Sequence, residues 1–361
     1  MPRLLPTTLT KLAHVRLRMQ AMVVGDSRFQ WRLFICLIAL TTLLPYVIMP
    51  LSVYFGKDVG ALLLASTLLN FLGGHAHVST TAFFYSDPTM REHFREHKLR
   101  YVYAPIILIL GVGLAYMITP EPYNRYILLY HFMWQTYHYQ RQNFGVLSFI
   151  SAATDGVPVS RLERLSLEFS AAAGMLALIK VNALSHQTIL EPFTSAIFVV
   201  AGLVYAVVPA LVFAAVITEP RLLRNPVRIC ALILFSAFYL PSFIFTDPVA
   251  AILGYALGHG LQYLVFMYYV GVSRPRPGIA LTSMVAIGII GGSALTFMTS
   301  AGDQSGSLYR LIFGMAIGTV MSHFVIDAGV WKLRYQFQRR YMQNAFSFVF
   351  ARQAKVPYQT L

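Results

Sequence analysis

Six histidines lie inside long apolar segments of this chain, and their number and spacing indicate metal chemistry. A histidine in hydrocarbon is costly, so it normally faces the interior of a helix bundle and pairs with another polar group or a ligand. Neutral imidazole suits iron, copper and zinc, whereas calcium and magnesium prefer oxygen donors. Four or five such nitrogens with few carboxylates suit iron, either as a non-haem ion or as haem with two axial histidines. The candidate metal ligands are His75, His77, His131, His138, His259 and His323.

The segment YHFMWQTYHYQRQNFG, residues 130–145, holds two of these histidines in the middle of an apolar stretch. Steps of four, three, four and three residues place one set of its side chains on a single stripe of a helix. The stripe consists of His131, Gln135, His138, Gln142 and Gly145. We predict that it faces the bundle interior, with Gly145 allowing another helix to approach closely.

Two shorter segments contain similar polar groups. His259 and Gln262 lie three residues apart in GYALGHGLQYLVF, where glycines on either side of His259 make the helix thin. We take Gln142 and Gln262 as candidates for contacts around the bound cofactor. His75 and His77 are two residues apart and would point to nearly opposite faces of a regular helix. Two glycines precede them and can distort the helix, so that one or both histidines reach the centre.

Two charged side chains in the same spans are candidate catalytic residues. Asp327 follows His323 by one helical turn in SHFVIDAGVWK. It can orient the ring of His323 through one N–H, as an acceptor usually does for a metal-ligating histidine. Arg141 lies one turn from His138 and needs an anionic partner. We expect that partner to be Asp327 or an anionic headgroup.

Ten apolar segments are long enough, or nearly so, to cross roughly 30 Å of hydrocarbon as helices. They cover residues 31–50, 59–85, 101–119, 126–150, 165–185, 193–217, 229–245, 249–271, 279–298 and 309–330. The six histidines fall on the second, fourth, eighth and tenth segments, which run in the same direction across the membrane. Four helices therefore present imidazoles in one layer spread over roughly 8 Å, with His131 two turns further out. We interpret this layer as one buried cluster.

The composition agrees with an all-α, polytopic bundle of transmembrane helices. Hydrophobic residues make up 57% of the chain and charged residues only 12%, and the mean hydropathy is +0.61. Of the 28 Lys and Arg residues, 23 fall in alternate loops and tails and four in the intervening loops. This alternation predicts an even number of spans with both termini in the cytoplasm. We expect a basic tail at 1–30, a membrane domain at 31–330 and a second basic tail at 331–361.

The net charge of +14 follows from the same distribution. Basic loops on one side of a membrane set the topology and contact anionic lipid headgroups, so membrane lipids are expected partners. We therefore do not interpret the charge as the footprint of a nucleic acid.

These features favour a metal-dependent oxidoreductase or oxygenase of the cytoplasmic membrane. Its substrate would be a lipid-soluble small molecule, such as an isoprenoid, a quinone or an acyl chain, and an electron donor is a further candidate partner. In architecture and number of histidines the chain resembles the membrane carotenoid-cleaving dioxygenases, in which histidines from several spans hold one iron.

Two other functions are compatible with the same residues. In a proton-coupled transporter, the histidines, Asp327 and Arg141 would form a titrating path. In a scaffold protein, the polar core would only fix the register of the helices.

A separate pair, His93 and His97, has the HxxxH spacing that places both rings on one helical face. It is either a metal site or part of an amphipathic turn at the membrane surface.

Overall fold

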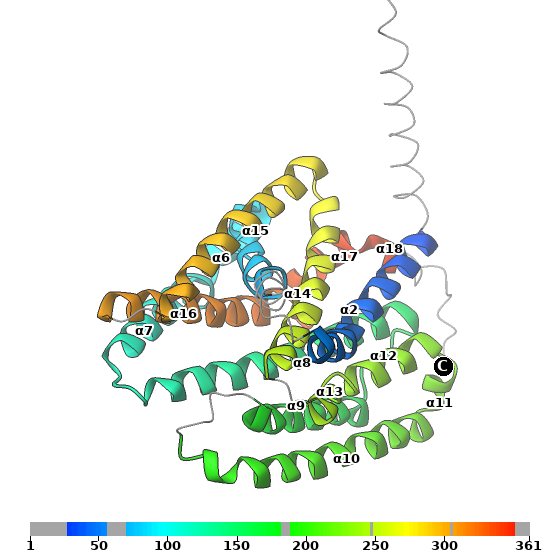
Figure 1. Cartoon of the computed structure of the whole chain (residues 1–361). Helices are drawn as coiled ribbons and strands as arrows, with labels where there is room; N and C mark the ends of the chain where they lie inside the picture. The colour runs from blue at the N-terminus through cyan, green and yellow to red at the C-terminus, as the bar shows by residue number, and fades with distance from the viewer. Residues whose placement is uncertain (1–26, 56–69, 182–187, 246–247, 304–305, 351–361) are drawn as a thin grey trace, which may run out of the picture.

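The computed structural model describes residues 27–55, 70–181, 188–245, 248–303 and 306–350, and these residues form helices with no strand among them (Figure 1). Within this part of the chain, six helical segments are long and apolar enough to cross a membrane. They are Ser27–Ile48, Leu99–Ile118, Glu191–Thr218, Pro226–Ile244, Pro277–Ser300 and Ser307–Val330. The predicted all-α class and the membrane-protein character are thus confirmed.

Ten spans remain a prediction. Three further helices are of spanning length but fall outside those six: α8 (Asn124–Thr154), α9 (Arg161–Val181) and α14 (Pro248–Val272). The predicted second span, residues 59–85, lies partly outside the described residues. Its described part is a broken helix made of the π-helical η1 (Phe71–Ala76), α4 (His77–Thr80) and α5 (Phe83–Ser86).

The remaining helices follow in chain order, and several begin with proline in the first turn, where its missing N–H costs nothing. They are α2 (Ser27–Phe55), α6 (Pro88–Glu96), η2 (Leu99–Tyr103), α7 (Ala104–Ile118), η4 (Glu191–Phe193), α10 (Thr194–Thr218), α11 (Pro220–Leu223), α12 (Pro226–Ser236), α13 (Pro241–Ile244), α15 (Pro277–Ser300), η5 (Ala301–Asp303), α16 (Ser307–Val330), α17 (Gln336–Ala345) and α18 (Ser347–Phe350). In α6, the side chain of Asp87 accepts from the amide of Met90 at 3.1 Å and caps the helix.

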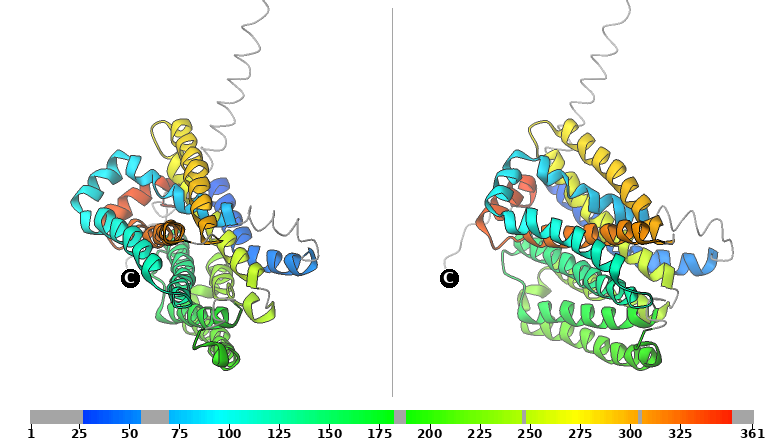
Figure 2. Two further views of the ribbon diagram at one scale, coloured as in Figure 1. Left: turned by 60° about the vertical axis from the view of Figure 1, so that its left-hand side comes forward. Right: turned by 90° about the vertical axis from the view of Figure 1, so that its left-hand side faces the viewer.

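Long helices pack in pairs: α7 with α16, α9 with α10, and α2 with α14. The α9–α10 pair forms one side of the molecule and α15 lies at the opposite side, with α14 and α8 between them (Figures 1 and 2). Along α10 the large apolar side chains of Val199, Leu203 and Phe213 are exposed. A helix that is apolar all round and exposed in this way suits contact with lipid.

Segments that the sequence analysis assigned to the basic side of the membrane meet at one end of the fold. Asp87 pairs with Arg274 at 2.8 Å and lies 3.4 Å from the hydroxyl of Tyr341. Burial raises the pKa of the Tyr341 phenol, which therefore stays protonated and can donate to Asp87. Residues 86–100, 271–277 and the C-terminal helices are joined here. Placing this end in the cytoplasm remains a prediction.

The C-terminal helices α17 and α18 cover that end, although the sequence analysis assigned them to a basic tail. Phe346 packs among Phe34, Phe149 and Phe266, with ring centroids 4.9 to 6.0 Å apart. Buried aromatic rings at these distances stabilise a fold beyond the area they bury. Residues 336–350 are therefore part of the packed structure.

Candidate metal centre

Four of the predicted histidines surround one point in the interior. They come from α4 (His77), α8 (His138), α14 (His259) and α16 (His323), and each side chain is buried. The ring centroids of His77 and His138 each lie 4.9 to 5.2 Å from those of His259 and His323. The His259 and His323 centroids lie 6.5 Å apart across this quadrilateral. These four rings lie next to one another, as the sequence analysis expected, and their role as metal ligands stays a prediction.

The distances between the ring centroids suit a metal ion among the rings. An imidazole nitrogen binds zinc or a similar ion at about 2.0–2.1 Å and lies roughly 1.1 Å from its ring centroid. An ion would therefore lie about 3.2 Å from each centroid, close to half of the 6.5 Å that separates His259 from His323. Ligand atoms of His77, His259 and His323 lie within 4.8 Å of one another, as do those of His138, His323 and Asp327.

Several ring nitrogens of these histidines have no partner. Within the part of the chain that the structure describes, both nitrogens of His77 and of His259 lack a hydrogen bond, as do the Nε2 atoms of His138 and His323. Buried polar atoms are normally satisfied, so unpartnered atoms gathered in one place require an explanation. A bound metal ion would accept the lone pairs of four of these nitrogens. The buried His/Asp group can thus hold a metal ion.

The carboxylate of Asp327 lies on the side of the histidine rings that faces the centre of the cluster. Its Oδ2 atom is 3.5 Å from Nε2 of His323 and 4.0 Å from Nε2 of His138, and its Oδ1 atom has no partner. The far nitrogen of His323, Nδ1, lies 2.7 Å from Oγ1 of Thr81. The sequence analysis expected Asp327 to orient the ring of His323. In the structure, Thr81 is the residue in position to do so, through Nδ1. Asp327 is placed as a fifth candidate ligand.

Thr81 links His323 to Tyr263, whose hydroxyl is 2.8 Å from the threonine Oγ1. We expect Thr81→Val, which keeps the side-chain shape, to weaken metal binding by roughly 10- to 100-fold, the usual cost of losing such an orienting contact. Thr80→Val is the matched control, because its hydroxyl bonds only the carbonyls of Ala76 and His77 in its own helix. Metal titration of the purified variants measures both. Equal losses in the two variants would contradict the role assigned to Thr81.

The position of His77 depends on the π-helix η1 directly before it. Such wide turns are often found at functional sites because they shift the register of the side chains that follow. A Cβ on Gly73 would lie 2.4 Å from the Cα of Leu257, and one on Gly260 would lie 2.3 Å from the carbonyl oxygen of Gly73. Only glycine therefore lets η1 and α14 touch through their backbones. This contact brings His77 next to His259.

We expect Gly260→Ala to push α14 away from η1, since a backbone carbonyl is in its way. The cost is about 1–3 kcal/mol of stability, typical of overpacking, together with weaker metal binding. Gly145→Ala is the control, because a Cβ there meets no described residue within 4 Å. The same observation shows that the predicted close helix approach at Gly145 is wrong. Thermal unfolding and metal titration compare the two variants, and equal effects would contradict this account.

Aromatic rings cover two of the histidines. Tyr139 stacks on His259 with centroids 4.3 Å apart, and Phe324 stacks on His138 at 4.4 Å. These rings fix the imidazole planes and exclude water from one face of each. Aromatic residues next to the predicted histidines were visible in the sequence, but their stacking partners were not.

The two predicted glutamines form a hydrogen-bonded chain next to the cluster. The amide of Gln142 donates to the carbonyl of His259 at 3.0 Å and to Oε1 of Gln262 at 2.9 Å. Gln262 donates in turn to Thr42 at 2.7 Å and Asn143 at 3.3 Å. This chain joins α8 to the backbone of α14 and to α2. Its contact with the histidine cluster is through the backbone of His259.

His75 and His131 lie apart from the four central rings. Nδ1 of His75 is 2.7 Å from Oγ1 of Thr296 on α15. His131 stacks on Phe324 at 6.0 Å and is buried, with no partner at its Nδ1. Of the pair His75 and His77, only His77 belongs to the ligand groups found among the described residues.

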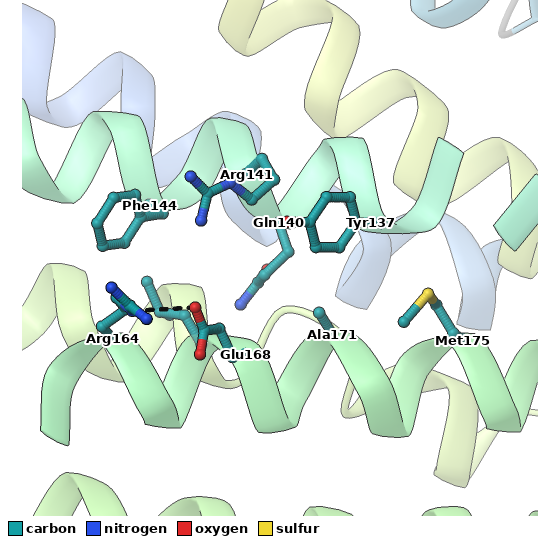
Figure 3. Close-up of a pocket in the computed structure, with 9 residues that line it drawn as sticks. Tyr137, Gln140, Arg141, Phe144, Arg164, Glu168, Ala171 and Met175 are labelled. Carbon is teal, nitrogen blue, oxygen red and sulfur yellow. Dashed lines mark ion pairs between the residues drawn. The ribbon is translucent and has the colours of Figure 1, made fainter. Parts of the chain in front are cut away.

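Arg141 faces the groove between α8 and α9 (Figure 3). Its guanidinium lies over the rings of Phe144 and Tyr137, at 5.0 and 6.0 Å from their centroids. Arg164 and Glu168, which pair with each other at 3.0 Å, line the same pocket. No ion pair joins Arg141 to Asp327 within the described residues. Its predicted catalytic role and its predicted contact with an anionic headgroup both stay hypotheses.

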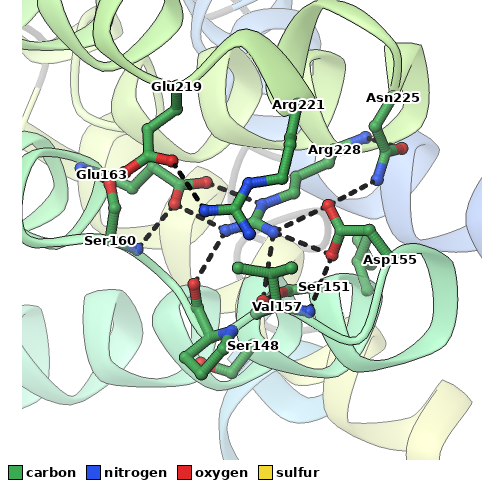
Figure 4. A network of polar contacts seen from close by, with 12 residues as sticks. Ser148, Ser151, Asp155, Val157, Ser160, Glu163, Glu219, Arg221, Asn225 and Arg228 are labelled. Carbon is green, nitrogen blue, oxygen red and sulfur yellow. Dashed lines mark hydrogen bonds and ion pairs between the residues drawn. The ribbon is translucent and has the colours of Figure 1, made fainter. Parts of the chain in front are cut away.

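A second buried polar group, around Arg228, lies outside the histidine cluster (Figure 4). Two guanidinium nitrogens of Arg228 donate to Glu163 at 2.9 and 2.7 Å, and Nη1 reaches both oxygens of Asp155 at 2.9 Å. The carbonyls of Val157 and Pro158 accept further bonds at 3.1 Å. Every N–H group of the Arg228 guanidinium is used in these hydrogen bonds, so the group has no donor left to bind a ligand. The hydrogen bonds join α12 to the α8–α9 connection and to the start of α9. The sequence analysis counted Arg228 only as a loop charge.

Comparison with models of protein families, with curated proteins and with solved structures finds no match to this chain. The class defined by fold and site is a helical, membrane-type protein with buried His/Asp groups that can bind a metal ion.

Proposed function

We propose that the chain is an integral membrane metalloenzyme, an oxidoreductase or oxygenase with one non-haem iron ion at the centre. The ligands are His77, His138, His259 and His323, with Asp327 as the anionic member. The observation that supports this most strongly is the convergence of four imidazoles from four helices, whose unpartnered nitrogens lie at a spacing that suits one metal ion. Four neutral nitrogens and one carboxylate are a donor set that iron accepts.

Packing alone is a poor explanation for the cluster. Helices in membranes associate through small residues and through satisfied polar contacts, and Ser or Thr would supply these at lower cost than histidine. The same space argues against haem. If two opposite rings were axial ligands, the other two would occupy the plane that a porphyrin needs, because adjacent rings are only about 5 Å apart.

The side chains around the ligands have separate tasks. Thr81 holds the far nitrogen of His323, and Gln142 holds the backbone of His259. Tyr139 and Phe324 cover imidazole faces and keep water away. A bound iron would supply one-electron and oxygen chemistry, and the protein would control its access and orientation.

The membrane setting restricts the substrate class. A site enclosed by apolar helices is reached most directly from the lipid phase, which favours an isoprenoid, a quinone or an acyl chain. We further propose that both termini and the basic end of the fold face the cytoplasm, where an electron donor would dock.

Binding of nitric oxide to the ferrous protein tests the redox assignment. The full chain is purified in detergent and loaded anaerobically with Fe²⁺, and the electron paramagnetic resonance signal of a high-spin iron–nitrosyl is recorded. We expect the signal in the wild type and in His131→Ala, and its loss in His323→Ala. A protein that retains Zn²⁺ and never takes Fe²⁺ would overturn the redox function while leaving a metal site in place.

A further inference from the structure

A second group of candidate ligands lies at the C-terminal end of α6, where His97 is the residue that caps the helix, separate from the central cluster. His93, Glu96 and His97 place one ligand atom each within 4.8 Å of one another. The two imidazole centroids are 4.2 Å apart, as expected for positions one helical turn apart. Glu96 and His97 are exposed, so their side chains can rotate to close around an ion.

The hydrogen bond made by one ring nitrogen of His97 leaves a lone pair on the other nitrogen, which can bind a metal. Its Nδ1 atom lies 3.0 Å from the backbone carbonyl oxygen of His93. A carbonyl oxygen can only accept, so Nδ1 carries the hydrogen and Nε2 keeps its lone pair. Metal-ligating histidines in proteins usually donate their other N–H to an acceptor of this kind.

His93 is held between two residues of α17, Phe337 and Gln338. The ring is buried and stacks on Phe337, with centroids 4.0 Å apart and planes 11° apart. Its Nε2 atom is 3.2 Å from the amide nitrogen of Gln338, a residue that is 4% exposed and whose Oε1 has no hydrogen-bond partner among the described residues. An amide nitrogen can only donate, so metal binding by His93 requires this amide to turn over, with Oε1 accepting from Nε2–H. The lone pair of His93 then lies on Nδ1.

We propose that His93, Glu96 and His97 form a second divalent-metal site, of the class that binds zinc, with water in its remaining positions. Two imidazoles and one carboxylate are a set that zinc accepts with an open position. Arg95 and Lys98 lie on the same segment and repel free cations. The carboxylate of Glu96 is therefore needed to offset their charge. The site is independent of the central one, and it would connect metal binding to the docking of α17 through Gln338.

Zinc titration of the full-length chain in detergent, purified without a histidine tag, tests the proposal. The exposed positions permit mild changes, His97→Ala and Glu96→Gln. We expect the wild type to bind one more Zn²⁺ than His97→Ala, and Glu96→Gln to bind that ion at least tenfold more weakly. Glu92→Gln removes an exposed carboxylate from the same helix and should leave binding unchanged.

Unchanged affinity and stoichiometry in both His97→Ala and Glu96→Gln would overturn the second site. Equal weakening in Glu92→Gln would also overturn it, because general surface charge would then explain the effect. His323→Ala separates the two sites, since it should lose the central ion and keep the one on α6. A negative result for the second site therefore does not affect the proposed function. A negative result for the central site does not affect the proposed site at His93, Glu96 and His97.

Discussion

His138→Ala should reduce the central metal content at least tenfold while the protein remains folded. The ring of His138 lies about 5 Å from those of both His259 and His323, and its Nε2 has no hydrogen bond among the described residues. Its removal leaves three imidazoles and opens one side of the cluster to the space under Phe324. The effect is read by metal analysis of the detergent-purified chain. A His97→Ala background keeps the proposed α6 site from contributing.

His131→Ala is the matched control, because it removes a buried histidine from the same helix two turns away. It also packs on Phe324, yet it does not belong to the ligand groups found among the described residues. We expect it to keep its metal. If both variants keep or both lose the ion, the assignment of His138 as a ligand is wrong. Melting temperatures of both variants separate loss of a ligand from loss of the fold.

Arg228→Met should cause the largest loss of stability of any single change outside the metal centre. The change leaves Glu163 and Asp155 without their shared cation, and Glu163 is fully buried. Breaking a buried ion pair by removing one partner typically costs 3–5 kcal/mol, because an uncompensated charge stays behind. The free energy of unfolding, measured in mixed micelles, should fall by about that amount.

Arg164→Met provides the comparison on the neighbouring helix. Arg164 pairs with Glu168 at 3.0 Å, but both side chains are substantially exposed, so its loss should cost at most about 1 kcal/mol. A triple change that also neutralises Glu163 and Asp155 should recover part of the stability lost in Arg228→Met. An Arg228→Met protein as stable as Arg164→Met would refute the buried network as a structural element.

The sequence carried enough information to predict the class and the buried cluster of histidines. Histidine in an apolar span is rare and costly, so its position along parallel-running segments is a strong indicator of depth. His77, His138, His259 and His323 meet as expected. Periodicity also gave Gln142 a place on the inner face of α8. These inferences needed only the pitch of a helix and the cost of burying a polar group.

Other features depend on local irregularities that periodicity does not encode. The π-helical turn at Phe71–Ala76 decides that His77, and not His75, reaches the cluster. Thr81 orients His323 from a distant part of the chain, and no pattern in the sequence pairs them. Arg228 looked like a loop charge because its partners lie about 70 residues earlier. The described helices support six spans by length and composition, and the count of ten stays a prediction.

The most direct measurement is metal analysis combined with an absorption spectrum on the purified full-length chain, carried out in the His97→Ala background. The account predicts one transition-metal ion per chain and no Soret band, with the ion lost in His323→Ala. A folded, monodisperse protein without stoichiometric metal would contradict the central claim and favour a titrating path through the same histidines. A Soret band would contradict the non-haem assignment.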